Sequence, residues 1–465
     1  MAVKGSLERF FAPRNVAVIG ASQTKGRPGH TVIKNMKTAG YSGAIYPVNP
    51  KGGRILGLKA FTCIEDLPLG VDLAIIILPA LSAPQAVRDC ARVKIGSVVL
   101  VAGGFAEVDQ AGENLQKELS RAVEESGVRV LGPNTAGHIS TPENFTSSFF
   151  PLGEIPRGPI SYVAQTGNFT GAMMKHIMSA ENYGVARCIG LGNTIDIDET
   201  DVFEFLGEDP HTRAIFFYLE SIKRPRAFVE IAKQVTPKKP VIMLKGGSTA
   251  EGAAAALSHT ASLGSDDSIL DGALRQAGIV RIEEFSHLFL AAKAIAPMPA
   301  PLGNRVGFVS PSGAFIVHIS DLCRRRLDLT FPTLTKRTMA RLKEISPPFI
   351  RLANPVDIFP SATVHGMEFA YYEAMKAVLA DPNVDAVVSI MILTKELGVP
   401  SLDFIPELAK KYPKKPIYIS FSGDHDCNVA AKAFLEPQGI PTFPLIEDSF
   451  KALDILFRAR RQLSK

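Results

Sequence analysis

One histidine stands in a stretch of small and polar residues that could carry chemistry. His259 lies between Lys245-Gly-Gly-Ser248 and Ala261-Ser-Leu-Gly264, after a predicted strand and before a helix predicted to begin near Asp266. Small residues let such a loop approach a phosphate closely. Because imidazole is largely neutral near pH 7 and nucleophilic, His259 could accept a phosphoryl group without a metal ion of its own. An ordinary loop histidine explains the same pattern, so the hypothesis needs further support.

A carboxylate partner for this histidine must come from a distant part of the chain. Glu220 follows the apolar run Phe216–Leu219, which is predicted to be a strand. A carboxylate there could hold the second ring nitrogen, fix its tautomer and stabilise the cationic ring. We therefore predict that Glu220 orients His259.

A phosphate-binding turn is predicted after the first strand. Gly20-Ala-Ser22 ends that strand, and Lys25, Gly26 and Gly29 precede a helix. Small residues let the backbone approach a pyrophosphate, and the N–H groups at a helix start favour an anion. The spacing is not GxGxxG, because Ser22 stands where that motif needs its second glycine, and a purely structural turn is the alternative.

The second strand argues against a nicotinamide cofactor. It runs into Pro47-Val-Asn-Pro50-Lys51 and lacks the acidic residue that binds the ribose of NAD. Two further loops of small residues, Ala102–Phe105 and Gly132–Asn134, follow later strands. These loops indicate a ligand that lies across the carboxyl edge of a parallel sheet.

These candidate residues depend on an alternation of short apolar strands with helices, which is typical of an α/β fold with parallel sheets. The nearly continuous apolar character of the strands indicates that helices cover both faces. A polar, proline-rich connection at 141–159 and a proline-rich linker at 296–304 separate three predicted domains. We place them at 1–145, 150–297 and 303–465.

Ser161-Tyr-Val-Ala-Gln-Thr-Gly167 and Gly307-Phe-Val-Ser-Pro-Ser-Gly313 both put a small hydroxyl residue and a glycine after a strand. This match indicates an old duplication of the second domain into the third. Chance similarity between two α/β domains is the alternative.

The composition excludes several classes of protein. With 465 residues, 46% hydrophobic and 21% charged, the chain is typical of a globular protein with two to four domains. We expect no membrane segment, no secretory signal and a cytoplasmic location. The five cysteines are scattered, so neither a disulfide framework nor a metal site is predicted. The net charge of +5 is mild, and the basic run 324–326 is read as a solvated helix face, not as a nucleic-acid site.

Taken together and in this order, the motifs resemble those of the α subunits of nucleoside-diphosphate-forming acyl-CoA synthetases, of the ADP-forming acetyl-CoA type. The resemblance covers nearly the whole chain. The segments that carry it are Val16-Ala-Val-Ile-Gly-Ala-Ser22, Pro47-Val-Asn-Pro50, Gly103-Gly-Phe-Ala-Glu107, Gly132-Pro-Asn134, Gly192-Asn193, Asp209-Pro210, Glu220, Ser258-His-Thr260 and Asn354-Pro-Val-Asp357.

The resemblance implies a Rossmann-like CoA-binding domain followed by two flavodoxin-like domains related to succinyl-CoA synthetase. It implies that His259 is phosphorylated, with Glu220 as its partner. The implied CoA site consists of Gly20, Ser22, Lys25, Gly29, Asn49, Pro50, Gly103 and Asn134. We expect the backbone around Gln165, Thr166, Gly167, Gly192 and Asn193 to bind phosphate.

The chain contains no P-loop of the form GxxxxGK[ST] and no evident nucleotide-metal motif. The resemblance therefore implies a separate β subunit with an ATP-grasp fold that binds ADP or ATP with Mg²⁺, in an α2β2 assembly. The expected reaction interconverts acyl-CoA, phosphate and ADP with free acid, CoA and ATP.

The chain departs from the family pattern at several positions. Ala164 and Thr166 stand in a turn that usually reads Ser-Gln-Ser-Gly, Thr135 replaces a cysteine, and Ala261 replaces a glycine after His259. Pro311 and Ser312 stand where a Gly-Gly pair is common. The alternative hypothesis is therefore a CoA-binding regulatory subunit with reduced catalysis. A plain NAD(P) oxidoreductase is disfavoured, because it leaves the histidine segment unexplained.

Overall fold

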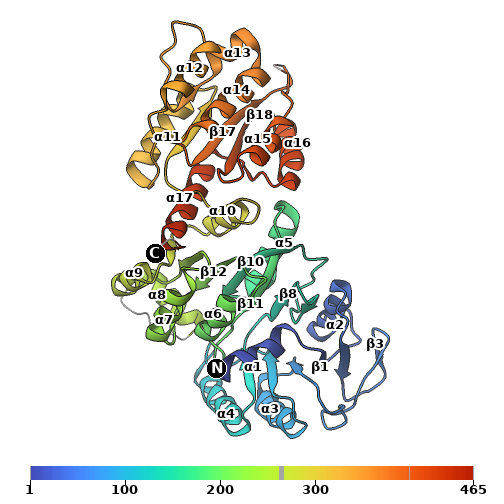
Figure 1. Cartoon of the computed structure of the whole chain (residues 1–465). Helices are drawn as coiled ribbons and strands as arrows, with labels where there is room; N and C mark the ends of the chain where they lie inside the picture. The colour runs from blue at the N-terminus through green and yellow to red at the C-terminus, as the bar shows by residue number, and fades with distance from the viewer. Residues whose placement is uncertain (1, 261–266, 397, 464–465) are drawn as a thin grey trace. The chain divides into compact units, whose positions relative to one another are not determined.

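The computed structural model of the chain describes residues 2–260, 267–396 and 398–463 (Figure 1). The chain divides into two compact units, Met1–Glu283 and Glu284–Lys465. Two large sheets lie in the first unit and one in the second, and all three are built mainly of parallel strands. The predicted α/β class with Rossmann-like and flavodoxin-like sheets is confirmed. No helix in the described residues is long and apolar enough to cross a bilayer.

The first sheet has the strand order β2-β1-β5-β6-β7, and all of its strands are parallel. Alternate residues of β1 point to opposite faces: Ala17 and Ile19 pack with α3 and α4, whereas Val16 and Val18 pack with α1 and α2. The elements are α1 (Ala2–Phe11), β1 (Asn15–Ile19), α2 (Pro28–Ala39), β2 (Ala44–Val48), β5 (Leu73–Ile76), α3 (Ala83–Arg92), β6 (Ser97–Leu100), α4 (Gln110–Ser126) and β7 (Arg129–Leu131), with the small hairpin β3 (Arg54–Ile55) and β4 (Leu58–Lys59).

The second sheet has the order β14-β13-β12-β10-β11-β8-β9, of which the first five strands are parallel. β8 and β9 are antiparallel and extend the sheet beyond β11. The elements are β8 (His138–Ser140), β9 (Phe145–Thr146), β10 (Arg157–Ala164), α5 (Ala172–Ala180), β11 (Val185–Gly190), α6 (Glu199–Glu208), β12 (Ala214–Leu219), α7 (Pro225–Val235), β13 (Val241–Lys245), α8 (Ala250–Thr260), α9 (Asp267–Gln276) and β14 (Val280–Ile282).

The predicted connection at 141–159 therefore holds more regular structure than expected. β9 lies inside it, and β10 begins within it at Arg157. These strand segments are short and partly polar, and their pairing with distant strands is what stabilises them.

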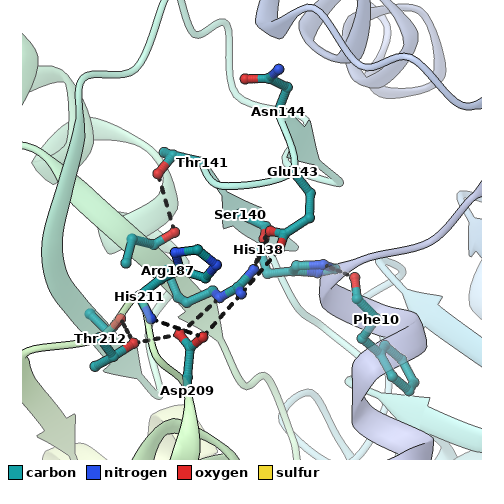
Figure 2. Close-up of polar contacts among 12 residues, drawn as sticks. Phe10, His138, Ser140, Thr141, Glu143, Asn144, Arg187, Asp209, His211 and Thr212 are labelled. Atoms are coloured by element: carbon teal, nitrogen blue, oxygen red, sulfur yellow. Dashed lines mark hydrogen bonds and ion pairs between the residues drawn. The ribbon is translucent and has the colours of Figure 1, made fainter.

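A buried ion pair ties β8 to the rest of the second sheet (Figure 2). Nε of Arg187, on β11, lies 3.2 Å from Oδ2 of Asp209. Both side chains are buried, with exposures of 4% for Arg187 and 2% for Asp209. The guanidinium of Arg187 also contacts Ser140 and Glu143. Because each buried charge has an opposite charge and hydrogen bonds, the cluster can be accommodated in the core.

His138 joins the N-terminal helix to the same region (Figure 2). Its Nε2 donates to the carbonyl oxygen of Phe10 at 2.6 Å, and its Nδ1 accepts from the Ser147 hydroxyl at 2.8 Å. Burial lowers the pKa of His138 to about 4. The ring is therefore neutral at ordinary pH and fixes α1 against the second sheet.

The third sheet lies in the second unit and has the order β16-β15-β17-β18-β19, again parallel. Its five strands follow the same order as the parallel strands of the other two sheets: second, first, third, fourth, fifth. Because the first sheet shares this order as well, the order does not distinguish the predicted duplication from chance similarity between α/β domains. The elements are α10 (Ser286–Ile295), β15 (Val306–Ser310), α11 (Gly313–Arg326), α12 (Lys336–Glu344), β16 (Val356–Asp357), α13 (Phe359–His365), α14 (Met367–Ala380), β17 (Ala386–Leu393), α15 (Phe404–Lys411), β18 (Ile417–Gly423), α16 (His425–Leu435), β19 (Thr442–Phe443) and α17 (Ile446–Leu463).

The prediction of a loop around His259 is wrong for its first part. Residues 250–260 form α8, and the backbone of His259 lies in the last turn of that helix. The run of alanines at 253–256 explains the helix, because alanine has the highest helix propensity. The side chain of His259 and the predicted loop residues 261–264 lie outside the described part of the chain.

Candidate functional site

The turn after β1 has the tight geometry predicted for a phosphate-binding loop. Gly20 has φ +90°, a backbone angle that glycine adopts without strain. The N–H groups of Gly20 and Ala21 both donate to the carbonyl of Val48 at 3.1 Å. A Cβ on Gly29 would collide with the backbone of Gly20 and Ala21, so the start of α2 packs directly on this turn. The turn after β1 and the start of α2 are therefore packed backbone against backbone, which only glycine at these positions allows.

The second predicted CoA segment lies against the first. The side-chain amide of Asn49 donates to the carbonyl of Ala21 at 2.7 Å, and its oxygen accepts from the N–H of Lys51 at 2.9 Å. Pro50, Lys25 and its neighbours are exposed, and Ser22 accepts a hydrogen bond from the N–H of Thr24 at 3.1 Å. Six predicted CoA residues are therefore gathered at the carboxyl ends of β1 and β2: Gly20, Ser22, Lys25, Gly29, Asn49 and Pro50.

The other two predicted CoA residues, Gly103 and Asn134, lie at the carboxyl ends of β6 and β7. Asn134 has φ +57°, its N–H donates to the carbonyl of Ala102 at 2.8 Å, and its side chain bonds that of Asn193 at 3.3 Å. A Cβ on Gly103 would lie 2.9 Å from Oδ1 of Asn134. The eight residues thus follow one edge of the first sheet, from β2 to β7, as expected for a long ligand.

Glu107 holds the loop after β6 in place. Its carboxylate accepts from the N–H groups of Gly104 at 2.7 Å and Phe105 at 3.1 Å, and from the Asn193 amide at 2.7 Å. Burial raises the pKa of Glu107, but the hydrogen bonds from Asn193 and Gly104 outweigh this effect and hold it below its usual value. The charged form of Glu107 therefore joins the loop of Gly103 to that of Asn193.

The predicted phosphate residues occupy two loops of the second sheet. Gln165, Thr166 and Gly167 connect β10 to a short 3-10 helix, and Thr166 accepts the N–H of Asn168 at 3.3 Å. Gly192 and Asn193 follow β11, and the N–H of Asn193 donates to the carbonyl of Pro133 at 2.8 Å. Backbone hydrogen bonds thus hold the second loop against the first sheet.

Gln165 connects the phosphate turn to Glu220. Its side-chain oxygen accepts the N–H groups of Glu220 at 2.7 Å and Ser221 at 2.9 Å, and its amide donates to the carbonyl of Ser221 at 3.0 Å. Gln165 is buried, with 6% exposure. One side chain therefore fixes the distance between the turn after β10 and the carboxylate after β12.

Glu220 also faces the segment that leads into α8. The Tyr218 hydroxyl donates to Oε1 of Glu220 at 3.3 Å, and burial together with the charge of Glu220 raises the pKa of Tyr218 to about 12. The Lys245 ammonium donates to the carbonyl of Glu220 at 2.6 Å, and to that of Gly246. Burial lowers the pKa of Lys245. These contacts place Glu220 beside the start of the segment that carries His259.

A cavity of about 170 Å³ brings the two groups of predicted residues together. Asn134 of the CoA set and all five phosphate residues line it: Gln165, Thr166, Gly167, Gly192 and Asn193. Gln165, Gly192 and Asn193 also line a larger neighbouring cavity of about 670 Å³, which is walled by polar side chains of α4. The two predicted subsites thus meet at one place within the first unit.

Several residues of this site were not predicted. Glu107 was noted only as part of a motif, and Lys223, whose ammonium donates to the carbonyl of Asn193 at 3.1 Å, was not noted at all. Phe149 and Phe150 line the cavity without any motif to mark them. The spacing Gly104-x-x-Glu107, in which an acid follows a glycine loop, is a signal that could have identified Glu107. The two phenylalanines carry no such signal, since only the tertiary fold brings them there.

Comparisons with known proteins agree with this arrangement. Residues 14–140 match the model of a CoA binding domain, and residues 157–295 match that of a succinyl-CoA ligase like flavodoxin domain. The chain is similar over its whole length to the dinucleotide-forming acetyl-coenzyme A synthetase 1 of Ca. Korarchaeum cryptofilum, solved in complex with phosphate and ADP. That similarity has a TM-score of 0.90 at 30% identity and covers 98% of this chain and 97% of that chain.

The chain is also similar to acetate–CoA ligases (ADP-forming). It is 37% identical to the Archaeoglobus fulgidus enzyme II over 96% of this chain, but it spans only 66% of that protein's length. It is 33% identical to the α subunit of the Pyrococcus furiosus enzyme I, with 97% of both chains covered. It is equally 33% identical to the α subunit of the Pyrococcus furiosus enzyme II, with 95% of both covered. The chain therefore belongs to the family of ADP-forming acetate–CoA ligases and corresponds to their α subunits.

Proposed function

We propose that this chain is the α subunit of an ADP-forming acid–CoA ligase that acts through a phosphohistidine at His259. The observation that carries the proposal is the cavity that Asn134 shares with Gln165, Thr166 and Gly167, next to Glu220. A thioester at the end of the CoA site would there meet a phosphate held by the turn after β10. Relatives of the chain are named as ligases or synthases of acetyl-CoA, 4-hydroxybutyryl-CoA and trans-feruloyl-CoA, which supports an acyl-CoA as the substrate class.

In the first step, an oxygen of inorganic phosphate attacks the thioester carbonyl carbon. The C–S bond breaks, CoA leaves as the thiol and an acyl phosphate remains. The negative charge that develops on the carbonyl oxygen needs donors fixed in advance. Asn134, Thr166 and Gly167 line the cavity, and the side-chain amide of Asn134 with the backbone N–H groups of Thr166 and Gly167 would supply these donors.

In the second step, a ring nitrogen of His259 attacks the phosphorus atom. The P–O bond to the acyl group breaks, and the free acid leaves as a carboxylate. Glu220 would hold the other ring nitrogen and stabilise the cationic ring that forms. The bonds from Gln165, Tyr218 and Lys245 keep Glu220 in place for this role.

The residues of the first sheet fit CoA. Gly20 and Gly29 let the turn after β1 pack directly on the start of α2. The N–H groups at that helix start would bind the pyrophosphate, and the exposed Lys25 supplies a positive charge on the same turn. Asn49 and Pro50 shape the neighbouring turn. Gly103 and Asn134, at the other end of the row, would lie near the thiol.

A partner chain completes the proposed reaction. Two relatives are named as α subunits, which supports a second subunit. We propose that it is a β subunit of the ATP-grasp fold in an α2β2 assembly, and that the reaction takes place in the cytoplasm. When bound there, ADP with Mg²⁺ would accept the phosphoryl group from His259, with the metal neutralising charge on the phosphates.

The proposed division into domains 1–145, 150–297 and 303–465 gives each domain five parallel strands of one sheet. It differs from the structure in that β8 and β9 pair with the second sheet and the second compact unit begins at Glu284. The competing hypothesis of a regulatory subunit with reduced catalysis rests on Ala164 and Ala261. Ala164 is fully buried in β10 and does not line the cavity, so the hydroxyl that it lacks is not needed there. Ala261 lies outside the described residues.

Co-purification with a candidate ATP-grasp partner tests the proposal. We expect ATP formation from acetyl-CoA, phosphate and ADP with both chains present, and none with either chain alone. Full activity of this chain alone would contradict the division between subunits. CoA binding without phosphorylation of this chain would favour the regulatory alternative.

A further inference from the structure

The cavity that holds the predicted phosphate residues also has an apolar side that the proposed chemistry does not use. Its apolar lining residues are Val101, Ala136, Phe149 and Phe150, and its polar ones include Asn134 and Gln165. Resting on the function proposed above, we infer that this apolar side is the pocket for the acyl group. We infer further that it selects short aliphatic acyl groups and excludes aromatic ones.

The position of the wall follows from the requirements of the reaction. The reacting carbonyl carbon must lie between the sulfur of CoA and the attacking phosphate oxygen. If Asn134 marks the thiol end and Thr166-Gly167 the phosphate, the acyl chain is left to face the remaining side of the same cavity. That side carries the two phenylalanine rings, whose burial against an alkyl group is favourable.

The two rings are fixed. They stack on each other with centroids 4.9 Å apart and an interplanar angle of 23°. On Gly171, an added Cβ would lie 2.8 Å from the ring of Phe150, so this glycine leaves room for the ring in its observed position. A wall that cannot move aside can discriminate by size.

The backbone that carries Phe149 and Phe150 is also held in place, by a residue of α2, which packs on the first sheet. The amide of Asn35 on α2 donates to the carbonyl of Ser148 at 2.8 Å and to that of Phe150 at 2.6 Å. Its oxygen accepts the N–H of Leu152 at 3.3 Å, and the residue is only 3% exposed. Asn35 is therefore a positioning residue for the phenylalanine wall.

The volume of the cavity sets the size limit. A cavity of about 150 Å³ is enough to hold benzene. The cavity here measures about 170 Å³ in total, and it must contain the phosphate together with the acyl group. The space left beside the phosphate in this cavity is therefore smaller than an aromatic ring. The larger neighbouring cavity shares Gln165, Gly192 and Asn193 with it but none of the four apolar lining residues.

The test uses this chain together with its ATP-grasp partner and measures kcat/KM for acetyl-CoA, isobutyryl-CoA and phenylacetyl-CoA. The wild-type complex should prefer the two aliphatic substrates. Phe150→Ala and Phe149→Ala should each raise the ratio of phenylacetyl-CoA to acetyl-CoA by about 10-fold or more, the range that one or two methylene groups give in an apolar pocket. Phe349→Ala removes a ring that is 81% exposed in the second unit and serves as the matched control, with an unchanged ratio.

Two results would overturn the inference while leaving the proposed function intact: a wild-type preference for phenylacetyl-CoA, or ratios that stay within twofold in both cavity variants. If either alanine variant fails to fold, Phe150→Leu and Phe149→Leu give the same comparison with a smaller expected change. Absence of ATP formation with every acyl-CoA would instead refute the proposed function, and the inference with it.

Discussion

The second and third sheets share one topology but differ at the positions that would carry chemistry. Val163 of β10 pairs with Phe217, and Glu220 stands three residues beyond Phe217. In the third sheet, Val309 of β15 pairs with Ser389, and the third residue beyond it is Ile392. An aliphatic side chain thus takes the place of the carboxylate.

The turns after the first strands differ in the same way. Gln165, which binds Glu220, corresponds to Pro311, which has neither a side-chain amide nor a backbone N–H. Gly247, two residues after β13, and Gly423, the last residue of β18, both have positive φ, +70° and +114°. Twelve residues beyond Gly247 stands His259, and twelve beyond Gly423 stands Leu435, whose neighbour Phe434 is exposed. The comparison teaches that the shared fold supplies the scaffold, whereas a few side chains at its edge supply the reactivity.

The largest effect is expected from removing the carboxylate of Glu220, which has no counterpart in the second unit. Glu220→Gln keeps the shape of the side chain but loses the charge that stabilises a cationic imidazole. We expect phosphorylation of the chain to slow by on the order of 10⁴-fold, as when the orienting carboxylate of a catalytic histidine is replaced by its amide. The measurement is the rate of acid-labile labelling with phosphate and acetyl-CoA. Ile392→Ala, at the matching position, should change this rate less than twofold, and a fast Glu220→Gln variant would refute the role of Glu220.

The next largest effect is expected where β8 and β9 extend the second sheet, since the third sheet has no such strands among its described residues. Arg187→Met leaves Asp209, which is 2% exposed, without its opposite charge. Breaking one side of a buried pair costs about 3–5 kcal/mol. Hydrogen exchange should show this loss in Met1–Glu283 and no change in Glu284–Lys465.

Two further variants control the Arg187 experiment. Arg226→Met changes an exposed arginine of α7 and should leave the protection factors unaltered. The double variant Arg187→Met with Asp209→Leu should recover part of the loss, because no buried charge then remains unpaired. Equal destabilisation by Arg187→Met and Arg226→Met would show that the buried pair is unimportant.

A smaller effect is expected at the helix that follows the second parallel strand of each sheet, which is α6 after β11 and α13 after β16. α6 begins with Glu199, which is fully buried, whereas α13 begins with Phe359, which is 56% exposed. Oε1 of Glu199 accepts the backbone N–H of Lys223 at 2.6 Å, whereas Oε2 of Glu199 has no hydrogen-bond partner among the described residues. Burial, and then the charge of Asp198, raise the pKa of Glu199 from 4.5 to about 7.

The sign of the pH dependence follows from this raised pKa. Between pH 4.5 and 7 the folded state keeps a proton that the unfolded state has lost, so the stability of the first unit falls as the pH rises through this window. The total loss is on the order of 3 kcal/mol. Glu199→Gln should remove this slope in hydrogen-exchange measurements from pH 5 to 8, whereas Glu204→Gln, on the exposed face of α6, should keep it. An unchanged slope in Glu199→Gln would contradict the assignment.

The sequence was sufficient to predict the elements whose local signals are strong. The apolar run predicted to be a strand ending at Leu219 is β12, and the strand predicted to end before the Gly20 turn is β1. The alternation of strands and helices predicted the parallel sheets. The glycine turns after β1 and β10 were recognisable because backbone geometry restricts the residue types that fit there.

Features that depend on distant parts of the chain could not be predicted. β9 is two residues long and exists through its pairing with β8. The loop predicted around His259 is largely helix, since the alanine run outweighed the small and polar residues on which the prediction rested. Phe149 and Phe150 reach the cavity because Asn35, more than a hundred residues earlier, holds their backbone.

The most direct test of the difference between the two units is phosphate labelling. The chain and its ATP-grasp partner are incubated with labelled phosphate and acetyl-CoA, and the modified peptide is identified. The account predicts an acid-labile phosphoryl group on His259, absent in His259→Ala and retained in Phe434→Ala. Undiminished labelling of the His259→Ala variant, or a label confined to the second unit, would contradict it.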